Sequence, residues 1–541
     1  MYRTLLLLMG VLSLAFAQTQ EPLDLSMVHR IRAEALQNSK VMDHMFNLTD
    51  ANGHRLTGSP GYKKAADWVV KQAQSYGLSN AHLEKWGPFG RGWDFTRFSA
   101  HLIEPTYAPL IGFPLAWSEG TKGPVRGEPV LAVLRTNEDL DKFKGKLKGK
   151  IVLADAARET PQLTTPLARR YSEEELDKLE LAPEPGQLGF FTTRTNFAGP
   201  GGPGGPTRGN FADARQFRTK RAEFLKSEGV LAVVSTGTTA DGGTVFSTSG
   251  GSEDPKRAVP PPMIVLTPEH YNRILRLLEK KIPVKLELEV EAKFYDDAQD
   301  SWNVIAEIPG GKRKDEIVMI GAHLDSWHGG TGATDNAAGS SVALEVLRVL
   351  KSLNVQMDRT IRMGLWSGEE QGLLGSKAYV KERFADPTKM ELRPEHSKLA
   401  GYFNLDNGTG KIRGVYLQGN DMVRPIFAKW LEPFKDLGAS RLSIRTTGGT
   451  DHLSFDAVGI PGFQFIQEPM EYSTRTHHSN MDVYDHISRA DLMQASAIMA
   501  SFVYNTAMRA EMLPRKPLPK PQPERRRGEG PPSGTPSGGT Q

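Results

Sequence analysis

The chain has 541 residues, of which 38% are hydrophobic and 24% are charged. This is enough length for more than one domain and enough apolar material for a packed core, so a predominantly disordered chain is excluded. The formal net charge of +4 gives no reason to expect a nucleic-acid partner. Because cysteine is absent, disulfides, thiolate nucleophiles and cysteine zinc sites are excluded, and any metal must be held by His, Asp or Glu.

A basic and then apolar segment opens the chain. Arg3 precedes the apolar run Leu5–Phe16, and Ala15-Phe16-Ala17 fits an A-x-A cleavage site. The run is too short to cross a bilayer, so we predict a signal peptide at residues 1–17, cleaved near Ala17, rather than a membrane anchor. The mature protein is then expected to be secreted or periplasmic and to have no integral membrane segment.

Residues from about 25 to 83 are expected to be helical, with Ala65, Ala66, Val69, Val70 and Ala73 at helical spacing before Gly77. From about 110 to 283, short β-type runs at 129–134, 150–154 and 230–235 alternate with Gly- and Pro-rich loops and with predicted helices at 214–227 and 268–280. The loop 199–206 contains only Gly and Pro, without the Lys of a phosphate-binding loop. We therefore predict a smaller domain at 110–283, inserted into a larger one formed by 18–109 and 284–513.

The remaining segments alternate between strands and helices. Residues 317–320 are continuously apolar, which is typical of a central strand of a parallel sheet. Further strands are predicted at 361–366, 399–405 and 462–466, and helices at 336–351 and 375–384. This pattern predicts an α/β fold with a mixed, largely parallel sheet sandwiched by helices. Residues 514–541, rich in Pro, Gly, Arg and Ser, are expected to form a disordered tail, inert rather than a basic binding arm.

Imidazoles and carboxylates follow the predicted strands one after another: His323, Asp335, Glu369, Glu370, Asp406 and His478. Singly, each has an ordinary explanation, since a strand-end His is usually structural, Asp before a helix usually caps it, and adjacent Glu residues usually face solvent. Because functional residues of α/β sheets lie on loops beyond strand ends, their recurrence there favours one shared site.

The motifs around these residues are H-L-D-S (323–326), T-D-N-A-A-G (334–339), G-E-E-Q-G-L-L-G-S (368–376), N-L-D (404–406) and H-x-x-x-D (478–482). In this order they resemble the zinc exopeptidases typified by bacterial leucyl aminopeptidases and glutamate carboxypeptidases, and most of all the plasma glutamate carboxypeptidase branch. The segment 110–283 looks like the β-rich protease-associated domain that such enzymes often carry. The resemblance implies the zinc-exopeptidase fold, two Zn²⁺ ions per chain and a peptide substrate.

The resemblance also implies a role for each residue. Asp335 would bridge the two ions, His323 and Asp406 would complete one site, and Glu370 and His478 the other. Glu369 would be the general base that takes a proton from the attacking water. Asp325 is interpreted as a carboxylate that orients the His323 imidazole.

Three further residues are assigned near the site. His477 either stabilises the tetrahedral oxyanion or is a spare loop histidine. Asp451 and His452 match a family motif, and a second-shell or substrate-facing role is favoured over metal ligation.

Three questions stay open at this point. The same two-metal chemistry serves aminopeptidases and carboxypeptidases or dipeptidases, and Arg445 and Arg475 are conceivable partners for a substrate carboxylate. Receptors related to these enzymes keep the fold but lose ligands, whereas all the ligand positions are occupied here. The absence of G-x-S-x-G and H-E-x-x-H motifs disfavours a serine hydrolase and a single-zinc protease. A homodimer is possible.

Overall fold

We describe the protein from a computed structural model, which places residues 21–160, 162–182, 211–237, 241–296 and 300–521. The predicted signal peptide at 1–17 and the Gly/Pro loop at 199–206 lie outside these residues. Within the described ranges, no helix combines the length and apolar character needed to span a membrane.

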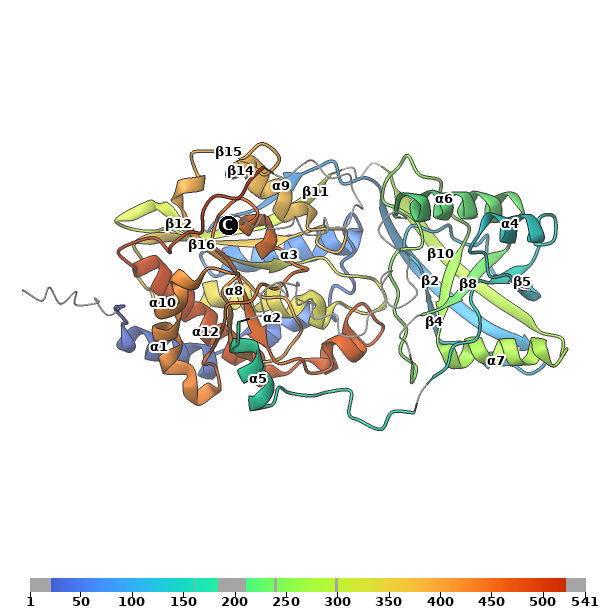
Figure 1. Cartoon of the computed structure of the whole chain (residues 1–541), viewed down its shortest axis with the longest axis horizontal. Coiled ribbons are helices and arrows are strands. Elements are labelled where there is room, and N and C mark those ends of the chain that lie inside the picture. The colour runs from blue at the N-terminus through green and yellow to red at the C-terminus, as the bar shows by residue number, and fades with distance from the viewer. Residues whose placement is uncertain (1–20, 161, 183–210, 238–240, 297–299, 522–541) are drawn as a thin grey trace, which may run out of the picture.

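The larger lobe is built on a mixed eight-stranded sheet (Figure 1). Across the sheet the strands are β1 (Ser79–Trp86), β11 (Ser301–Ile308), β13 (Arg359–Trp366), β12 (Arg313–His323), β16 (Leu399–Asn404), β19 (Gly462–Gln467), β17 (Ile412–Tyr416) and β18 (Arg441–Ser443). The four central strands, β13, β12, β16 and β19, are parallel to their neighbours in that group, and β1, β11 and β17 join antiparallel. The predicted mixed, largely parallel sheet is confirmed.

Helices cover both faces of this sheet. The apolar run of β12 is buried on both faces. Val318 and Ile320 lie in one buried cluster, whereas Ile317 and Met319 lie in another. Successive strand residues point to opposite faces, so a strand covered on both sides is apolar throughout. The first face is covered chiefly by α1 (Leu25–Gln37), α2 (Val41–Leu48), α3 (Pro60–Ser75), α8 (Ala338–Ser352), α10 (Arg424–Leu431) and α12 (Arg489–Met508). The second face carries α9 (Leu374–Arg383) and α11 (His452–Asp456).

The predicted helical stretch from 25 to 83 is wrong at its carboxyl end. Helix α3 ends at Ser75, and Gly77 has a left-handed φ of 71° that stops the helical path. Residues 79–86 instead form β1, which pairs antiparallel with β11. That pairing depends on a partner more than 200 residues further along the chain, which no local pattern reveals.

The smaller lobe contains two sheets (Figure 1). The four-stranded sheet has β3 (Ala108–Pro109), β2 (Gly92–Glu104), β10 (Lys285–Tyr295) and β5 (Val125–Gly127). The five-stranded sheet has β4 (Gly112–Pro114), β9 (Met263–Leu266), β8 (Ala232–Thr236), β7 (Ile151–Leu153) and β6 (Pro129–Leu131), with α4 (Asn137–Phe143), α6 (Phe211–Ser227) and α7 (Pro268–Glu279) beside it. Strands β2 and β10 extend this lobe beyond residues 110 and 283. Its assignment as a protease-associated domain stays a prediction.

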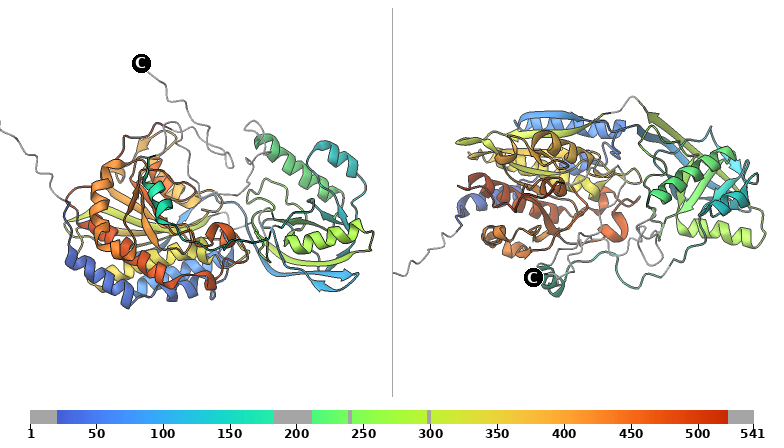
Figure 2. Two further views of the ribbon diagram at one scale, coloured as in Figure 1. Left: turned by 60° about the horizontal axis from the view of Figure 1, so that its bottom comes forward. Right: turned by 45° about the horizontal axis from the view of Figure 1, so that its top comes forward.

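Two segments tie distant parts of the chain together. Residues 162–182, which we call the strap, leave the smaller lobe after β7, and their helix α5 (Glu173–Glu180) lies against the larger lobe (Figures 1 and 2). Residues 514–521 of the predicted tail also contact the larger lobe, where Arg515 donates hydrogen bonds to the carbonyls of His396 and Leu399. The larger lobe further contains the short strands β14 (Ala385–Asp386) and β15 (Glu391–Leu392).

Candidate metal centre

The predicted ligands meet at the carboxyl edge of the central strands. His323 is the last residue of β12, Glu370 follows β13, and Asp406 follows β16. Because β12 is parallel to both β13 and β16, these three strand ends lie at the same edge of the sheet. The parallel topology therefore gathers side chains that are up to 83 positions apart in the sequence.

Asp335 reaches this edge from the turn between β12 and α8. Its own φ and ψ, −130° and 85°, are extended, and the turn is held by side chains on either side. Asp482 accepts hydrogen bonds from Thr334 N at 2.5 Å and from Asp335 N at 3.3 Å. Asn336 Nδ2 donates to the carbonyl of Leu405 at 2.9 Å, which links the turn to the loop after β16.

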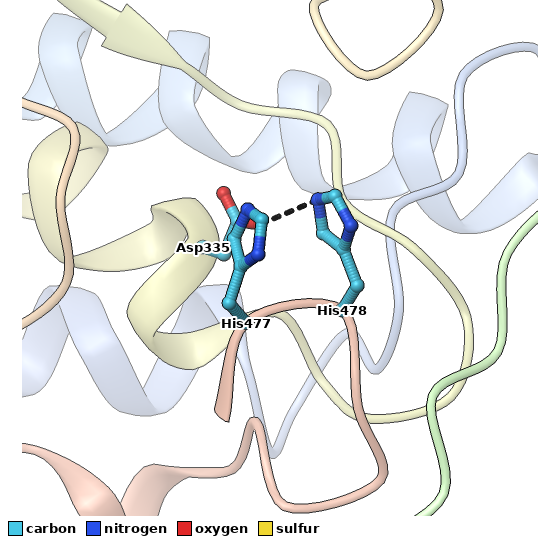
Figure 3. A group of neighbouring side chains, drawn as sticks. All are labelled: Asp335, His477 and His478. Atoms are coloured by element: carbon cyan, nitrogen blue, oxygen red, sulfur yellow. Dashed lines mark ion pairs between the residues drawn. The ribbon is translucent and has the colours of Figure 1, made fainter. Parts of the chain in front are cut away.

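The two carboxylate oxygens of Asp335 face two different sets of partners. Figure 3 shows His477 and His478 beside this carboxylate. His323 Nε2 lies 3.1 Å from Asp335 Oδ1 and 3.5 Å from Asp406 Oδ2. His478 Nε2 lies 3.1 Å from Asp335 Oδ2 and 2.9 Å from Glu370 Oε2. The arrangement thus consists of two groups of three side chains that share one carboxylate.

The chemistry of these groups fits zinc. Two ligand atoms that are each about 2.0–2.2 Å from a tetrahedral zinc ion lie roughly 3.3–3.5 Å apart, close to the contacts above. Buried ligand atoms in both groups lack a hydrogen-bond partner among the described residues: His323 Nε2, Asp335 Oδ2, Glu370 Oε1 and Asp406 Oδ1. Burying polar atoms without a hydrogen bond is costly, and a bound cation would satisfy them together. Sets of His and carboxylate ligands without thiolates suit Zn²⁺.

Glu369 lies beside the centre, with Oε2 4.0 Å from His323 Nε2 and only 9% of the residue exposed. Burial raises the pKa of its carboxyl well above the usual range, while the nearby His323 opposes that shift and Asp406 adds to it. A carboxyl group with a raised pKa can both accept and return a proton near neutral pH.

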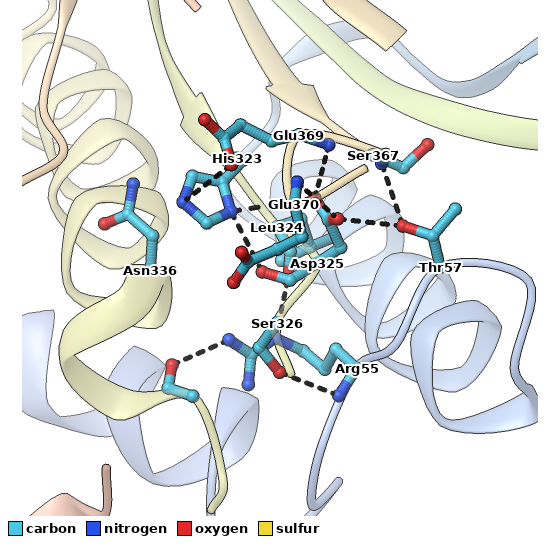
Figure 4. Close-up of polar contacts among 12 residues, drawn as sticks. Arg55, Thr57, His323, Leu324, Asp325, Ser326, Asn336, Ser367, Glu369 and Glu370 are labelled. Carbon is cyan, nitrogen blue, oxygen red and sulfur yellow. Dashed lines mark hydrogen bonds and ion pairs between the residues drawn. The ribbon is translucent and has the colours of Figure 1, made fainter. Parts of the chain in front are cut away.

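Asp325 acts on the loop after β13 rather than mainly on the imidazole (Figure 4). His323 Nδ1 is 3.0 Å from the main-chain oxygen of Asp325, whereas the carboxylate is 3.6 Å away. The fully buried carboxylate accepts hydrogen bonds from Glu369 N, Glu370 N and Thr57 Oγ1. The residue therefore orients His323 through its backbone and positions Glu369 and Glu370 through its side chain.

The other predicted site residues occupy different surroundings. His477 Nε2 lies 3.6 Å from Asp335 Oδ2, and its ring stacks on that of His478 with centroids 3.7 Å apart. Asp451 is buried and accepts a hydrogen bond from Ser376 Oγ at 2.5 Å. His452 Nε2 contacts the carbonyl of Thr447 at 3.1 Å, and burial lowers the pKa of His452 to about 4. The structure thus brings His477 to Asp335, whereas the contacts of Asp451 and His452 lie with the surrounding framework.

Arg55, Tyr472 and Asp482 also contribute to the site, although no role was predicted for them from the sequence. Asp482 ends the H-x-x-x-D motif, so a signal for it was present, and it holds the Asp335 turn. Arg55 is fully buried and donates to the carbonyls of Leu48, Leu324, Thr331 and Gly332, which fixes the loop after β12. Tyr472 packs against His477 with ring centroids 4.8 Å apart.

Comparisons with known proteins find similar peptidases. The model of the family described as peptidase family M28 matches residues 303–503. Carboxypeptidase Q of Bos taurus is 26% identical over 470 residues, which are 86% of this chain and 85% of the relative.

Two crystal structures share the fold. The peptidase M28 precursor of Shewanella amazonensis aligns with a TM-score of 0.61 and 24% identity over 92% of this chain and 98% of that chain. The zinc aminopeptidase BSAP of Bacillus subtilis aligns with a TM-score of 0.53 and 21% identity over 88% of this chain and 96% of that chain.

Proposed function

We propose that the protein is an exopeptidase with two zinc ions at the Asp335 centre. The premise is that residues 303–503 match the model of peptidase family M28. The observation that carries the proposal is the division of contacts around Asp335, whose two oxygens face separate pairs of ligands. A receptor-like protein that has lost catalysis would have no need for this complete set of candidate ligands together with a buried carboxyl group at Glu369.

In this proposal His323, Asp335 and Asp406 would hold one ion, and Asp335, Glu370 and His478 would hold the other. When bound, the ions would polarise the scissile carbonyl and make the attacking water more acidic. The Glu369 carboxylate accepts the proton of that water and passes it to the nitrogen of the leaving amine, so that the peptide bond breaks with its charges balanced. His477, 3.6 Å from Asp335 Oδ2, would donate to the oxyanion of the tetrahedral intermediate.

The substrates are short peptides or dipeptides, cleaved at a terminal bond outside the cytoplasm, as the segment at 1–17 predicts. The name of the Bos taurus relative points to the carboxyl end and that of the Bacillus subtilis structure to the amino end. Of the two arginines considered for a substrate carboxylate, Arg445 donates to the strap carbonyl of Lys178 at 2.8 Å, and Arg475 lies 3.6 Å from Glu471.

The test combines one variant with metal analysis and a small peptide panel. Glu369→Gln should lower kcat by about 10²–10⁴-fold, the usual contribution of a general base, while about two zinc ions per chain are retained. Asp335→Asn should lower zinc content as well. Blocking the substrate's amine or its carboxylate shows which end is recognised. Near-normal turnover by Glu369→Gln, or a zinc-free wild-type protein after reconstitution, would contradict the proposal.

A further inference from the structure

The strap crosses from the smaller lobe to the larger lobe (Figures 1 and 2). Its backbone pairs with the segment that leads from β19 to His478: Arg169 N donates to the carbonyl of Met470 at 3.0 Å. Tyr171 N donates to Glu468 Oε2 at 2.6 Å, and Glu468 is fully buried. The strap is therefore bound to the chain segment that carries the catalytic histidines.

Ion pairs of the acidic helix α5 hold the strap against the larger lobe. Arg441 Nη atoms lie 2.7 Å from carboxylate oxygens of Glu173, Asp177 and Glu180, all on α5. Arg413 lies 2.8 Å from Glu173 and 2.7 Å from the same Glu468 that accepts from Tyr171. Since many of these carboxylates are exposed to solvent, their attraction to the arginines should weaken at high ionic strength.

A pocket lies where the strap meets the larger lobe. It is a small pocket that is open to solvent, and it is lined by Tyr171 of the strap and by residues that include Asn407, Tyr416, Gln467 and Tyr472. Asn407 follows the ligand Asp406 directly in the chain, and Tyr472 packs against His477. The pocket is thus next to the metal centre, and its mouth is open to a substrate bound there.

The lining indicates what such a side chain would be. None of the described residues that line the pocket carries a formal charge. Gln467 is 5% exposed, and its Nε2 donates to the carbonyls of Gly408 and Gly410 at 2.9 and 3.3 Å. Its Oε1 is buried and, within the described part of the chain, accepts no hydrogen bond. A buried, unpaired acceptor favours a ligand that donates a hydrogen bond.

Building on the exopeptidase function proposed above, we propose that this pocket is a subsite for one uncharged substrate side chain that carries a hydrogen-bond donor, such as that of Tyr. Tyr171 forms the wall of this subsite that comes from the smaller lobe, and it is a specificity-determining residue. The smaller lobe thereby takes part in substrate selection through the strap.

The first experiment measures kcat and KM for dipeptides that differ only in carrying Tyr, Phe, Glu or Lys, placed on either side of the scissile bond. At one of the two positions beside the scissile bond, the kcat/KM of the wild type should be about 2- to 10-fold higher for Tyr than for Phe. This factor corresponds to one neutral hydrogen bond. Tyr171→Ala should raise KM for the Tyr substrate by roughly 10-fold at nearly unchanged kcat, because it removes binding surface and not reacting groups. Lys178→Ala, on the exposed side of the strap, is the matched control and should behave as the wild type.

A second variant loosens the strap from outside the pocket. Arg441→Gln should raise KM for the same substrate, and the difference from the wild type should depend on salt because the lost contacts are ionic. If Tyr171→Ala does not fold, Arg441→Gln tests whether the strap contributes to substrate binding. Unchanged KM values for every folded variant across the salt series would overturn the proposal.

Measuring the binding of tyrosinamide by calorimetry distinguishes a failure of the subsite proposal from a failure of the proposed function. A wild-type protein that cleaves no peptide but binds tyrosinamide, with the binding lost in Tyr171→Ala, would refute the exopeptidase and retain the subsite. A protein that cleaves the panel while Tyr171→Ala keeps the wild-type substrate profile would retain the exopeptidase and refute the subsite.

Discussion

Replacing Asp325 by Asn tests how the loop that carries Glu369 and Glu370 is held. The Asp325 carboxylate is fully buried and accepts from Glu369 N at 3.3 Å on Oδ1, and from Glu370 N at 3.4 Å and Thr57 Oγ1 at 2.8 Å on Oδ2. Asn keeps the shape but exchanges one acceptor oxygen for an NH₂ group, which only donates. Whichever way the amide is turned, at least one backbone N–H of the loop loses its acceptor and faces another donor.

The size of the effect follows from these contacts. A hydrogen bond to a charged group contributes about 1.5–3 kcal/mol, and 1.4 kcal/mol corresponds to a factor of about 10. We therefore expect Asp325→Asn to lower zinc affinity and kcat/KM by about 10- to 100-fold, the range found when groups that orient metal ligands are removed. Competition with a chelator measures the affinity, and peptide hydrolysis at saturating zinc measures the residual activity.

Thr57→Val is the matched control. It removes the hydroxyl that donates to Asp325 Oδ2 and accepts from Gly368 N, but it leaves the carboxylate and both loop contacts in place. Its effect on zinc affinity should be about 10-fold or less. If Asp325→Asn lost thermal stability but kept wild-type zinc affinity and kcat/KM, the loop would not depend on this carboxylate, and the reasoning would be refuted.

Two further predictions concern stability. Burial lowers the pKa of His44 to about 4. Its contribution to stability, on the order of 3 kcal/mol, is therefore present above the unfolded pKa of about 6.5 and is lost as the pH falls through about 4. His44→Gln should weaken the pH dependence of the unfolding free energy between pH 7 and 4.5, and an unchanged pH dependence would contradict this. Leu347→Ala, in the fully buried face of α8, should lower the unfolding free energy by about 2–5 kcal/mol through cavity formation, whereas exposed Lys351→Ala should leave the denaturant midpoint unchanged.

Local sequence patterns were sufficient to predict elements whose burial shows in the pattern itself. The apolar run at 317–320 predicted a strand covered on both faces, and Ile317 and Val318 do lie in different buried clusters. Local patterns failed at residues 79–83, where the continuing polar and apolar mixture gave no sign of strand pairing. Whether those residues form a strand depends on the free edge that β11 offers, which is a property of the folded sheet.

The same division holds at the site. His, Asp and Glu residues at successive strand ends, in a chain without cysteine, indicated which side chains could bind a metal, and the resemblance to zinc exopeptidases implied zinc. Only the tertiary structure decided that Asp325 acts on Glu369 and Glu370 through its carboxylate, that Asp482 holds the Asp335 turn, and that Tyr171 of the strap reaches the neighbouring pocket. The physical reason is the short range of hydrogen bonds and packing: ligand chemistry is a property of single residues, whereas these contacts join segments that only the folded chain brings within about 3–4 Å.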